Sequence, residues 1–266
     1  MKRTHIGAIL AGTILFSFLS CEADINEEII ASYFFGEEME KEDEDDILIK
    51  RNEVPTEGLI AYYGFDEDCK DSSGHNNDAT SIGYVQYCKG RFGESKGAIR
   101  FRNTTISAVT APHSEDFQHK NFTINAWVRT DSDYGGGIIV SKGYPTWGGS
   151  FYLSVNLCAF RTDDDNYVGT YMYKDQAQLP PTNGWQMITG VINNEWIGIY
   201  LNGELMKGGY SVESQKYYNQ LPLSIGSFYY EGIKDANRRI FDGDIDDVRI
   251  YNVSLSDQEI LKLYQE

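Results

Sequence analysis

Residues 243–252 read GDIDDVRIYN, a β-strand pattern that is followed at once by a helical tail, Leu255–Glu266. Isoleucine, valine and tyrosine supply the β-forming residues of this strand. Asp246 and Asp247 lie inside the apolar run instead of at its rim. A strand interior rarely holds carboxylates without a partner, so two interpretations are open. The acids are either hydrogen-bonded within the protein or ligands of a hard cation.

Short strand candidates recur from residue 58 onward, with turn residues between them. They are Leu59–Tyr63, Ala98–Phe101, Thr105–Thr110, Phe122–Arg129, Ile138–Ser141, Phe151–Asn156, Val168–Met172, Gln186–Ile192, Ile197–Leu201, Leu223–Ile225 and Asp244–Tyr251. The dipeptide Asn202-Gly203 is a signal for a type I′ hairpin. Strands without intervening helices predict an all-β fold, a two-sheet antiparallel jelly-roll sandwich. Only the last segment, with Ser256 as its N-cap, predicts a helix.

The N-terminus has the pattern of a secretory signal peptide. Lys2 and Arg3 precede an apolar run, Ile6–Leu19, that is too short to cross about 30 Å of hydrocarbon as a helix. The end of this run, Phe-Leu-Ser-Cys21, resembles the lipobox of bacterial lipoproteins, although phenylalanine stands where leucine is usual. The resemblance implies a signal peptide at residues 1–20 and lipidation of Cys21, which anchors the chain to a membrane. Cleavage nearby without lipidation is the alternative.

Residues 21–57 are predicted to be an acidic, largely disordered tether. Between Glu22 and Val54 there are 13 acidic and 3 basic residues, within a chain whose net charge is −17. Such a segment repels itself and stays extended. Acid directly behind a lipidated cysteine resembles the surface-export signal of lipoproteins in some Gram-negative bacteria, and a solvated spacer is the plain alternative. We therefore expect a surface-exposed protein of the outer membrane, and no nucleic-acid partner.

Eight segments follow one another in order from residue 58: GLIAYYGFDEDCKDSSGHNNDAT, KGAIRF, FTINAWVRT, IIVSKG, GWQMITGVI, IYLNGELM, LSIGS and FDGDIDDVRIYNVSLSDQEILKLY. In this order they resemble the laminin-G-like jelly roll of the concanavalin A-like lectin and glucanase superfamily. The resemblance covers residues 58–266, one domain of 209 residues. It implies two antiparallel sheets and often a structural calcium ion that ties the first strand to the last. Members serve as glycan-binding modules, adhesins and appendages of enzymes, so the fold alone does not fix the function.

The resemblance implies a calcium site built mainly on Asp66, in the turn that leaves the first strand, and on Asp246. Calcium takes oxygen ligands from carboxylates, carbonyls and water. Asp71 and Asn76 are further candidates, but an Asx-turn role, in which the side chain binds its own backbone, is favoured for both. Asp247 is expected to face the other side of the sheet, because side chains alternate along a strand. The four histidines have no spacing suggestive of zinc.

Cys69 and Cys88 flank the loop rich in aspartate and asparagine. Export past the cytoplasmic membrane permits a disulfide, and closing a loop of about 20 residues contributes roughly 3 kcal/mol. We therefore expect these two cysteines to pair. Cys158 is expected to be a buried small hydrophobe and not a nucleophile, because no histidine follows His119 in the chain.

An enzymatic function is not expected. Retaining glycosidases need two carboxyls about 5 Å apart, which family 16 hydrolases of this superfamily place on one strand as E-x-D-x-x-E. Residues 58–266 contain no such pattern, and the strand candidate Gln186–Ile192 carries no acid. Asp163, Asp164 and Asp165 lie in a polar segment and are expected to form a solvated turn, with a second cation site as the alternative.

Sugar binding is the positive hypothesis, because aromatic rings stack on sugars and short polar contacts orient them. The candidate aromatic residues are Tyr144, Trp147, Tyr167, Tyr171, Tyr173, Phe228, Tyr229 and Tyr230. Trp127 and Trp185 are instead expected to pack in the core. The expected protein is thus a lipid-anchored, calcium-stabilised module that binds an extracellular glycan without cleaving it. Binding of a surface protein is the leading alternative, since an exposed aromatic patch suits either partner.

Overall fold

The computed structural model describes residues 53–102, 107–131, 137–143, 150–161, 167–171, 184–193, 195–210, 219–228 and 239–266. All of them belong to one compact unit, Leu48–Glu266. Across these ranges, no helix combines the length and the apolar character that crossing a bilayer requires. The predicted signal peptide and most of the predicted tether lie outside the described residues.

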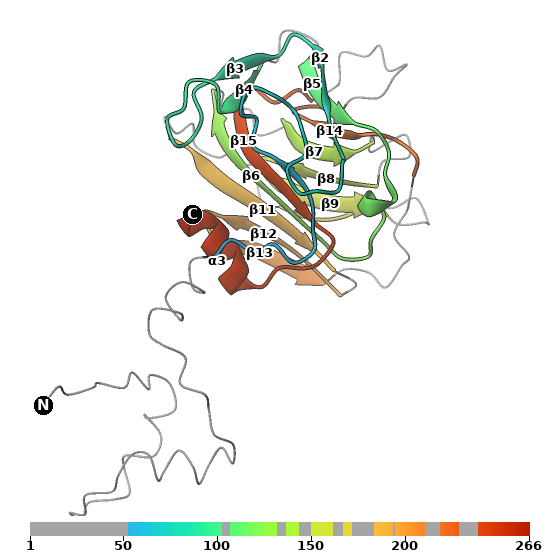
Figure 1. The fold of residues 1–266 in the computed structure, drawn as a ribbon. Helices are drawn as coiled ribbons and strands as arrows, with labels where there is room; N and C mark the ends of the chain where they lie inside the picture. Colours follow the sequence, from blue (N-terminus) through green and yellow to red (C-terminus); the bar gives the residue numbers. More distant parts are fainter. Residues whose placement is uncertain are drawn as a thin grey trace, which may run out of the picture. The chain divides into compact units, whose positions relative to one another are not determined.

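Two antiparallel sheets pack into a sandwich (Figure 1). Sheet A has the strand order β13-β12-β11-β6-β15-β4-β3, and β1 also pairs with β15. Its strands are β1 (Leu59–Tyr63), β3 (Gln86–Cys88), β4 (Ala98–Phe101), β6 (Phe122–Thr130), β11 (Gln186–Ile192), β12 (Trp196–Leu201), β13 (Glu204–Tyr210) and β15 (Gly243–Tyr251).

Sheet B has the order β10-β9-β8-β7-β14-β5-β2. Its strands are β2 (Thr80–Gly83), β5 (Ser107–Ala111), β7 (Ile138–Lys142), β8 (Phe151–Ser154), β9 (Leu157–Arg161), β10 (Tyr167–Tyr171) and β14 (Leu223–Ile225). The remaining elements are a 3-10 turn, η1 (Glu115–Phe117), and one helix, α3 (Asp257–Gln265). The predicted all-β, two-sheet antiparallel sandwich with a short C-terminal helix is therefore confirmed.

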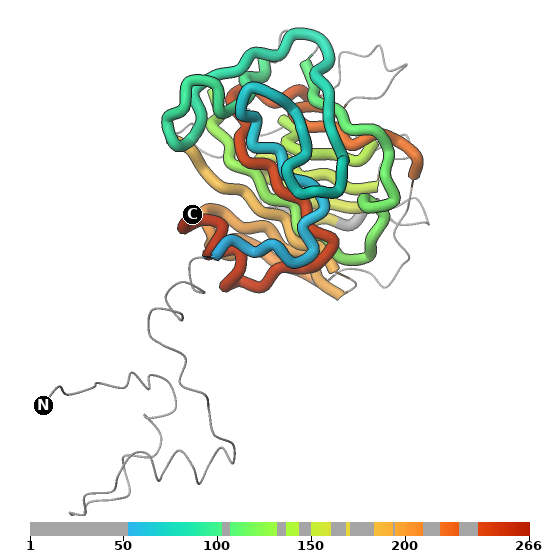
Figure 2. The backbone as a smooth tube through the Cα atoms, viewed as in Figure 1, coloured from blue at the N-terminus to red at the C-terminus, as the bar shows by residue number. Residues whose placement is uncertain are grey.

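The first and last strands of the domain lie side by side (Figure 2). On one side β15 pairs with β6 along most of its length. On its other side it pairs first with β4, at residues 243–245, and then with β1, where Tyr63 lies opposite Val248. The segment GDIDDVRIYN thus forms the centre of sheet A, which explains its apolar character on the face toward the core.

The predicted strands agree with the observed ones to within a few residues, apart from the short strands at the edges. β2 and β3 were missed because both are short and their side chains are largely exposed. β9 was missed because the strand predicted at Phe151–Asn156 is in fact shorter and ends at Ser154. Its chain turns at Ser154, whose Oγ accepts hydrogen bonds from the backbone N–H groups of Asn156 and Leu157.

Two local predictions are confirmed at the C-terminal half of sheet A. Asn202 and Gly203 both have positive φ angles, 51° and 83°, as a type I′ turn between β12 and β13 requires. Ser256 caps α3, and its side chain forms a reciprocal capping box with Glu259. The helix buries Ile260 and Leu263 against the outer face of sheet A.

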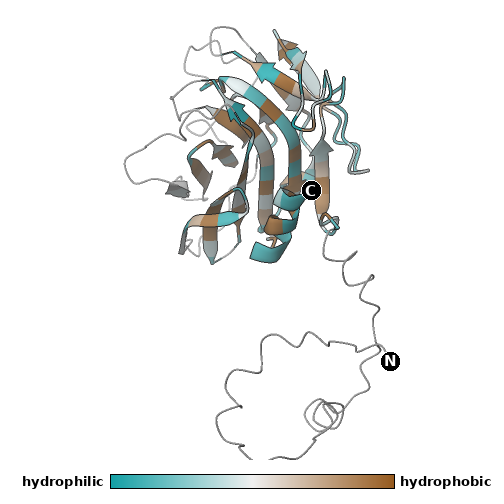
Figure 3. Cartoon of the chain, turned by 90° about the vertical axis from the view of Figure 1, so that its left-hand side faces the viewer, coloured by the Kyte–Doolittle hydropathy of each residue, from teal (hydrophilic) through white to brown (hydrophobic). Residues whose placement is uncertain are grey.

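The inner faces of the two sheets enclose one large apolar core, which includes Ile99, Ile124, Leu153 and Val248. Bands of hydrophobic and hydrophilic residues alternate along the strands, as expected when only one face meets this core (Figure 3). A second cluster lies on the outer face of sheet A, where α3 covers Trp127, Met187 and Tyr251. This leaves the part of the outer face around β4 and the beginning of β15 for polar side chains.

Candidate functional site

A β-bulge in β15 places two neighbouring carboxylates on the outer face of sheet A. The register against β6 shifts between Asp246 and Arg249, and Asp247 has a φ angle of 47°. Ile245 and Val248 on either side both point into the core. The expectation that Asp247 faces away from Asp246 is therefore wrong, because the extra residue of the bulge interrupts the alternation of side chains.

Asp247 is held by three groups of the outer face. It accepts a hydrogen bond of 2.6 Å from the Tyr62 hydroxyl and another from Nε of Arg91. Nη2 of Arg249 lies 3.7 Å from its other oxygen. Because the side chain of Asp247 is only 6% exposed, these contacts compensate for the loss of its hydration. Its role is that of a buried ion-pair partner.

Asp246 and Asp66 keep an excess of negative charge around them. The backbone N–H of Arg91 donates a 2.8 Å hydrogen bond to Asp246. Burial, and then the charge of Asp247, still raise the pKa of Asp246 to about 7. Burial, Glu94 and Asp247 raise the pKa of Asp66 as well. Both carboxyls thus lie where a cation would relieve charge repulsion, and both fit the predicted role as calcium ligands.

The other two predicted calcium ligands, Asp71 and Asn76, lie in the turn after the first strand. Both carboxylate oxygens of Asp71 accept backbone N–H groups, from Tyr62, Ser73 and Asn77, at 2.9 Å each. Asn76 adopts a φ angle of 61° in the same turn. For Asp71 this is the turn role that was favoured. In the described ranges no three His, Cys, Asp or Glu side chains are arranged to hold a metal, so carbonyls and water would have to complete a calcium shell.

The predicted disulfide between Cys69 and Cys88 is not formed, because the described cysteines carry free thiols. Cys69 Sγ lies 3.5 Å from the hydroxyl of Tyr87. Cys88 follows Tyr87 on β3 and therefore points to the opposite face, where its thiol bonds to Asp244. Burial and Asp244 raise the pKa of Cys88 to about 12. The sequence separation allowed a bridge, but the pleat of β3 separates the two sulfurs. Cys158 is fully buried, as expected.

A polar row crosses the outer face of sheet A, roughly perpendicular to its strands. Gln86 pairs with Arg100, Arg100 with Asp244, and Asp244 with Arg129, on β3, β4, β15 and β6 respectively. Trp185, just before β11, ends the row, and the guanidinium of Arg129 lies 5.1 Å from its ring. At about 4.8 Å between strands, the row is roughly 19 Å long. We call these five residues the polar row.

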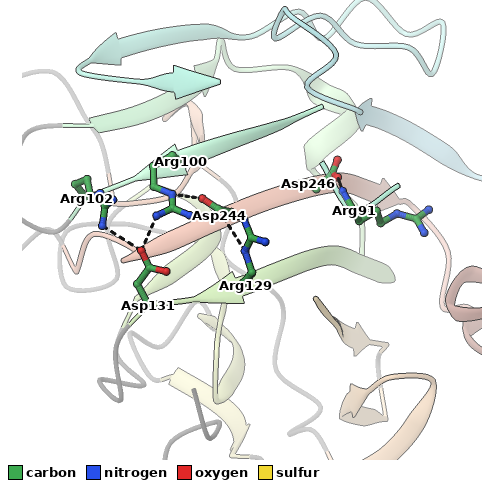
Figure 4. Close-up of polar contacts among 7 residues, drawn as sticks. All are labelled: Arg91, Arg100, Arg102, Arg129, Asp131, Asp244 and Asp246. Carbon is green, nitrogen blue, oxygen red and sulfur yellow. Dashed lines mark hydrogen bonds and ion pairs between the residues drawn. The ribbon is translucent and has the colours of Figure 1, made fainter. Parts of the chain in front are cut away.

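Asp244 is the centre of the polar row (Figure 4). Its side chain is fully buried, and it accepts hydrogen bonds from Nε and Nη2 of both Arg100 and Arg129. Such forked contacts hold guanidinium groups in fixed orientations. Breaking one of them would leave a buried charge without its partner, so the row is a rigid feature of the sheet.

Asp131 extends this network toward solvent. It accepts hydrogen bonds from Nη1 of Arg100, at 2.7 Å, and from Nη1 of Arg102, at 3.0 Å (Figure 4). Arg102 is about half exposed. The sequence contains a signal for this cluster, since Arg100 and Arg102, and likewise Arg129 and Asp131, are two residues apart and share a face. The pairing of β4, β15 and β6, which brings them together, was not predictable residue by residue.

The two tryptophans that were expected to pack differ in their surroundings. Trp127 is buried, and Tyr264 of α3 stacks on it with 5.7 Å between ring centroids. Trp185 packs against the same apolar cluster but is only partly buried. Packing is thus confirmed for Trp127. For Trp185 it is one of two roles, because its partly exposed ring also contacts Arg129 of the polar row.

Most of the aromatic residues predicted to bind sugar belong to segments that the structure does not describe. Tyr144, Trp147, Tyr173, Tyr229 and Tyr230 lie outside the described residues. Tyr167 and Tyr171 begin and end β10, at one edge of sheet B. Phe228 is buried against Tyr152, with 5.6 Å between ring centroids, so its expected role in stacking on a ligand is wrong.

A buried lysine braces the loops at the end of β7. Lys142 has no exposed surface, and its ammonium donates to the carbonyls of Asn219, at 3.2 Å, and Leu221. It lies 3.1 Å from Nδ1 of His113. Burial lowers the pKa of Lys142 to about 8. Ser150 N and Asn219 Nδ2 both donate to the Lys142 carbonyl, so the backbone of Lys142 is also held to Ser150 and Asn219.

Three comparisons with known proteins bear on this geometry. Domain 4 of AbnA, a GH43 extracellular arabinanase from Geobacillus stearothermophilus, in complex with arabinotriose, has a TM-score of 0.60 and 18% identity; the alignment covers 78% of this chain and 98% of that one. The binding domain of Paraclostridial Mosquitocidal Protein 1 has a TM-score of 0.60 and 21% identity, over 78% of this chain and 52% of that one.

The receptor-binding domain of botulinum neurotoxin mosaic serotype C/D has a TM-score of 0.60 and 16% identity, over 80% of this chain and 51% of that one. The alignments thus span about half of each toxin domain, and identities this low show the fold alone. No curated protein matched the chain in sequence. The family described as the concanavalin A-like lectin/glucanases superfamily, Laminin_G_3, matches residues 103–261. Because this match covers more than half of the sequence, the chain belongs to the concanavalin A-like lectin/glucanase superfamily.

Proposed function

We propose that this chain is a glycan-binding module without catalytic activity, and that the outer face of sheet A along the polar row is its binding surface. The observation that carries the proposal is the row itself. Two arginines are held by a fully buried Asp244 on paired strands, and the partly exposed ring of Trp185 lies next to them, directly before β11. Sites built on strands hold their geometry better than sites built on loops.

The chemistry of the polar row suits a saccharide. A flat ring such as that of Trp185 stacks on the apolar face of a sugar, and fixed N–H donors bind its hydroxyl oxygens. A row of about 19 Å across the strands is long enough to meet several consecutive sugar units. The structure of AbnA domain 4 with arabinotriose is that of a similar fold with an oligosaccharide, which supports the proposal.

A purely binding role is supported by the state of the carboxylates. In the polar row and its extension, Asp244 and Asp131 both accept hydrogen bonds from two arginines, so their oxygens are already engaged by partners within the protein. Residues 58–266 lack the E-x-D-x-x-E pattern of family 16 hydrolases. Two of the similar structures are described as binding domains of toxins.

The proposal is tested by substitution of Trp185. In a glycan array and in titration calorimetry, Trp185→Ala is expected to weaken binding of the recognised glycan at least about tenfold, as loss of an aromatic stacking platform does. Tyr84→Ala is the matched control, because Tyr84 is 60% exposed and lies between β2 and β3, outside the polar row. Binding that is unchanged in Trp185→Ala, or capture of a surface protein with no array signal, would reject the proposed surface or function.

Calcium forms a second part of the proposal, as a structural ion held with Asp66 and Asp246. Its support is that burial, and then neighbouring carboxylates, raise the pKa of both carboxyls. Calcium that binds only the folded protein must raise the melting temperature, and EDTA must lower it. Asp66→Asn and Asp246→Asn should each abolish this shift, whereas Asp68→Asn, at an exposed neighbouring position, should keep it. A midpoint that does not respond to calcium in the unsubstituted protein would remove the ion.

We also propose that lipid on Cys21 anchors the protein to the bacterial outer membrane, with the acidic segment 22–54 as a tether to the surface. The support is the sequence alone, namely the lipobox-like Phe-Leu-Ser-Cys21 and the acids behind it. Growth with labelled palmitate should label the protein, and Cys21→Ser should lose the label. Protease added to intact cells should degrade a surface-exposed protein, and protection from protease would place it elsewhere.

A further inference from the structure

The polar row and its extension offer more hydrogen-bond donors than the protein itself uses. Arg100, Arg102 and Arg129 each carry five N–H groups. Six hydrogen bonds join them to Asp131 and Asp244. Nη1 of Arg129 and Nη2 of Arg102 have no partner among the described residues. A ligand that approaches this surface therefore meets donors, because the carboxylate oxygens already accept from arginine.

The charge of this surface is opposite to that of the whole chain. Three arginines against two aspartates leave a local excess of one positive charge, whereas the chain has a net charge of −17. Asp244 is fully buried, but Arg129 is 28% exposed and Arg102 49% exposed. The positive groups thus reach solvent while the central negative group does not. A structural ion pair alone does not require the third, half-exposed arginine, Arg102.

We propose that the ligand of the polar row is an acidic glycan, and that Arg129 and Arg102 bind the carboxylate of a uronic-acid-type sugar that stacks on Trp185. This inference rests on the proposed glycan-binding function and names its ligand class. A guanidinium edge matches a carboxylate with two parallel N–H donors, which is a stronger contact than donation to a neutral hydroxyl. Asp244 holds Arg129 in place through Nε and Nη2, so Nη1 is left for the ligand.

The rest of the row fits the same ligand. Arg129 lies against the Trp185 ring, so a carboxylate bound by the guanidinium brings its sugar ring close to the indole. Among the described residues Arg102 is held through Nη1 to Asp131, which leaves its Nη2 donors to reach a second carboxylate of the same polymer. Because the chain as a whole repels anions, recognition depends on these short-range contacts and not on long-range attraction.

The experiment compares each acidic polymer with its own neutral derivative. Polygalacturonate, alginate and hyaluronan are titrated into the full chain, and then the same polymers after their carboxylates have been reduced to primary alcohols. At least one acidic polymer is expected to bind, and its reduced form to bind about tenfold more weakly or not at all. Arg102→Gln should reduce the preference severalfold without unfolding the domain, since Arg102 is half exposed. Lys207→Gln, an exposed cation on β13, should leave it unchanged.

The outcomes separate this inference from the function on which it rests. Equal binding of acidic and reduced polymers, or binding of neutral glycans alone, would overturn the acidic ligand, while loss of that binding in Trp185→Ala would keep the glycan-binding surface. Binding of an acidic polymer that neither Arg102→Gln nor Arg129→Gln weakens would also overturn the assignment. Failure to bind any glycan, acidic or neutral, would reject both proposals.

Discussion

Asp246 and Asp247 are adjacent in β15, and yet both side chains lie on the outer face of sheet A. The bulge that produces this arrangement gives the two carboxylates different partners. Asp247 binds Arg91 and the Tyr62 hydroxyl, whereas Asp246 accepts a backbone N–H and keeps a raised pKa. One acid therefore stabilises the sheet, and the other remains available to a cation.

The first prediction concerns Asp247. Asp247→Ala leaves Arg91 and Arg249 buried with less compensation, and alanine disfavours the positive φ angle. We expect the free energy of unfolding in urea, measured in EDTA, to fall by about 3 kcal/mol or more. Asp247→Asn tolerates the backbone conformation and should lose less, and Tyr62→Phe should lose about 1 kcal/mol. If Asp247→Ala lowers the free energy of unfolding by less than Tyr62→Phe does, the bulge does not depend on this carboxylate.

The second prediction concerns the pH dependence of Lys142. Its pKa is about 8 in the folded protein against 10.5 ordinarily, so between these values the unfolded chain binds more protons. The free energy of unfolding therefore rises as the pH increases from about 8 to 10.5, and this contribution is lost as the pH falls back through the folded pKa. Relative to Lys142→Met, the wild type should gain up to about 3 kcal/mol from pH 8 to pH 10.5.

Lys142→Met is the reference because tyrosines and cysteines also titrate in this range, and the difference between the two proteins removes their contribution. His113 and Glu115 face the ammonium and are present in both proteins, so the same difference removes their contribution. A difference that stays flat over this range would show that Lys142 keeps an ordinary pKa, and hence that its buried brace is hydrated in solution.

The third prediction concerns the contact between β11 and β9. A methyl group on Gly190 would lie 2.5 Å from Cys158 Sγ and 3.0 Å from Leu153 Cδ1. Gly190→Ala should therefore destabilise the protein by about 1–3 kcal/mol in chemical unfolding. Addition of Cys158→Ala removes the sulfur and should restore part of the loss, beyond the sum of the two single effects. Strict additivity would contradict the close packing of the two sheets at this point.

The fourth prediction concerns the thiols. Cys69 contacts Tyr87 on one side of β3 and Cys88 points to the other side, so the protein should have the mass of the free thiol form. A reducing agent should leave its melting temperature unchanged, because there is no bridge to break. Cys69→Ser and Cys88→Ser proteins, melted with and without the reducing agent, provide the controls. A mass lower by two hydrogens, with a melting temperature that falls on reduction, would show that the two thiols pair after all.

The sequence predicted the sandwich and its long strands because their apolar periodicity is local. It also predicted the Asn202-Gly203 hairpin and the capping of α3, which depend on a few neighbouring residues. It did not predict the bulge at Asp247, because a local break in alternation depends on how β15 pairs with β6 and β1. For the same reason the ion-pair partners of Asp244 were missed, since Arg100 and Arg129 are far from it in sequence.

The site predicted from aromatic residues and the site proposed from the structure have little in common. Aromatic loops were favoured because tyrosine and tryptophan between glycines suggest exposure, whereas Trp185 was assigned to packing from its place at a strand end. Trp185 becomes a candidate because its partly exposed ring contacts Arg129, which lies on the neighbouring strand. Such a relationship becomes visible once the order of β11, β6, β15 and β4 is known.

The central place of β15 in sheet A has a consequence for biogenesis. The strands β6, β4 and β1 all pair with β15, which is synthesised after them. The central part of sheet A therefore cannot form until synthesis of the domain is almost finished. A nascent chain of this kind stays loosely structured during translation, and its sheet A is completed only once β15 has left the ribosome.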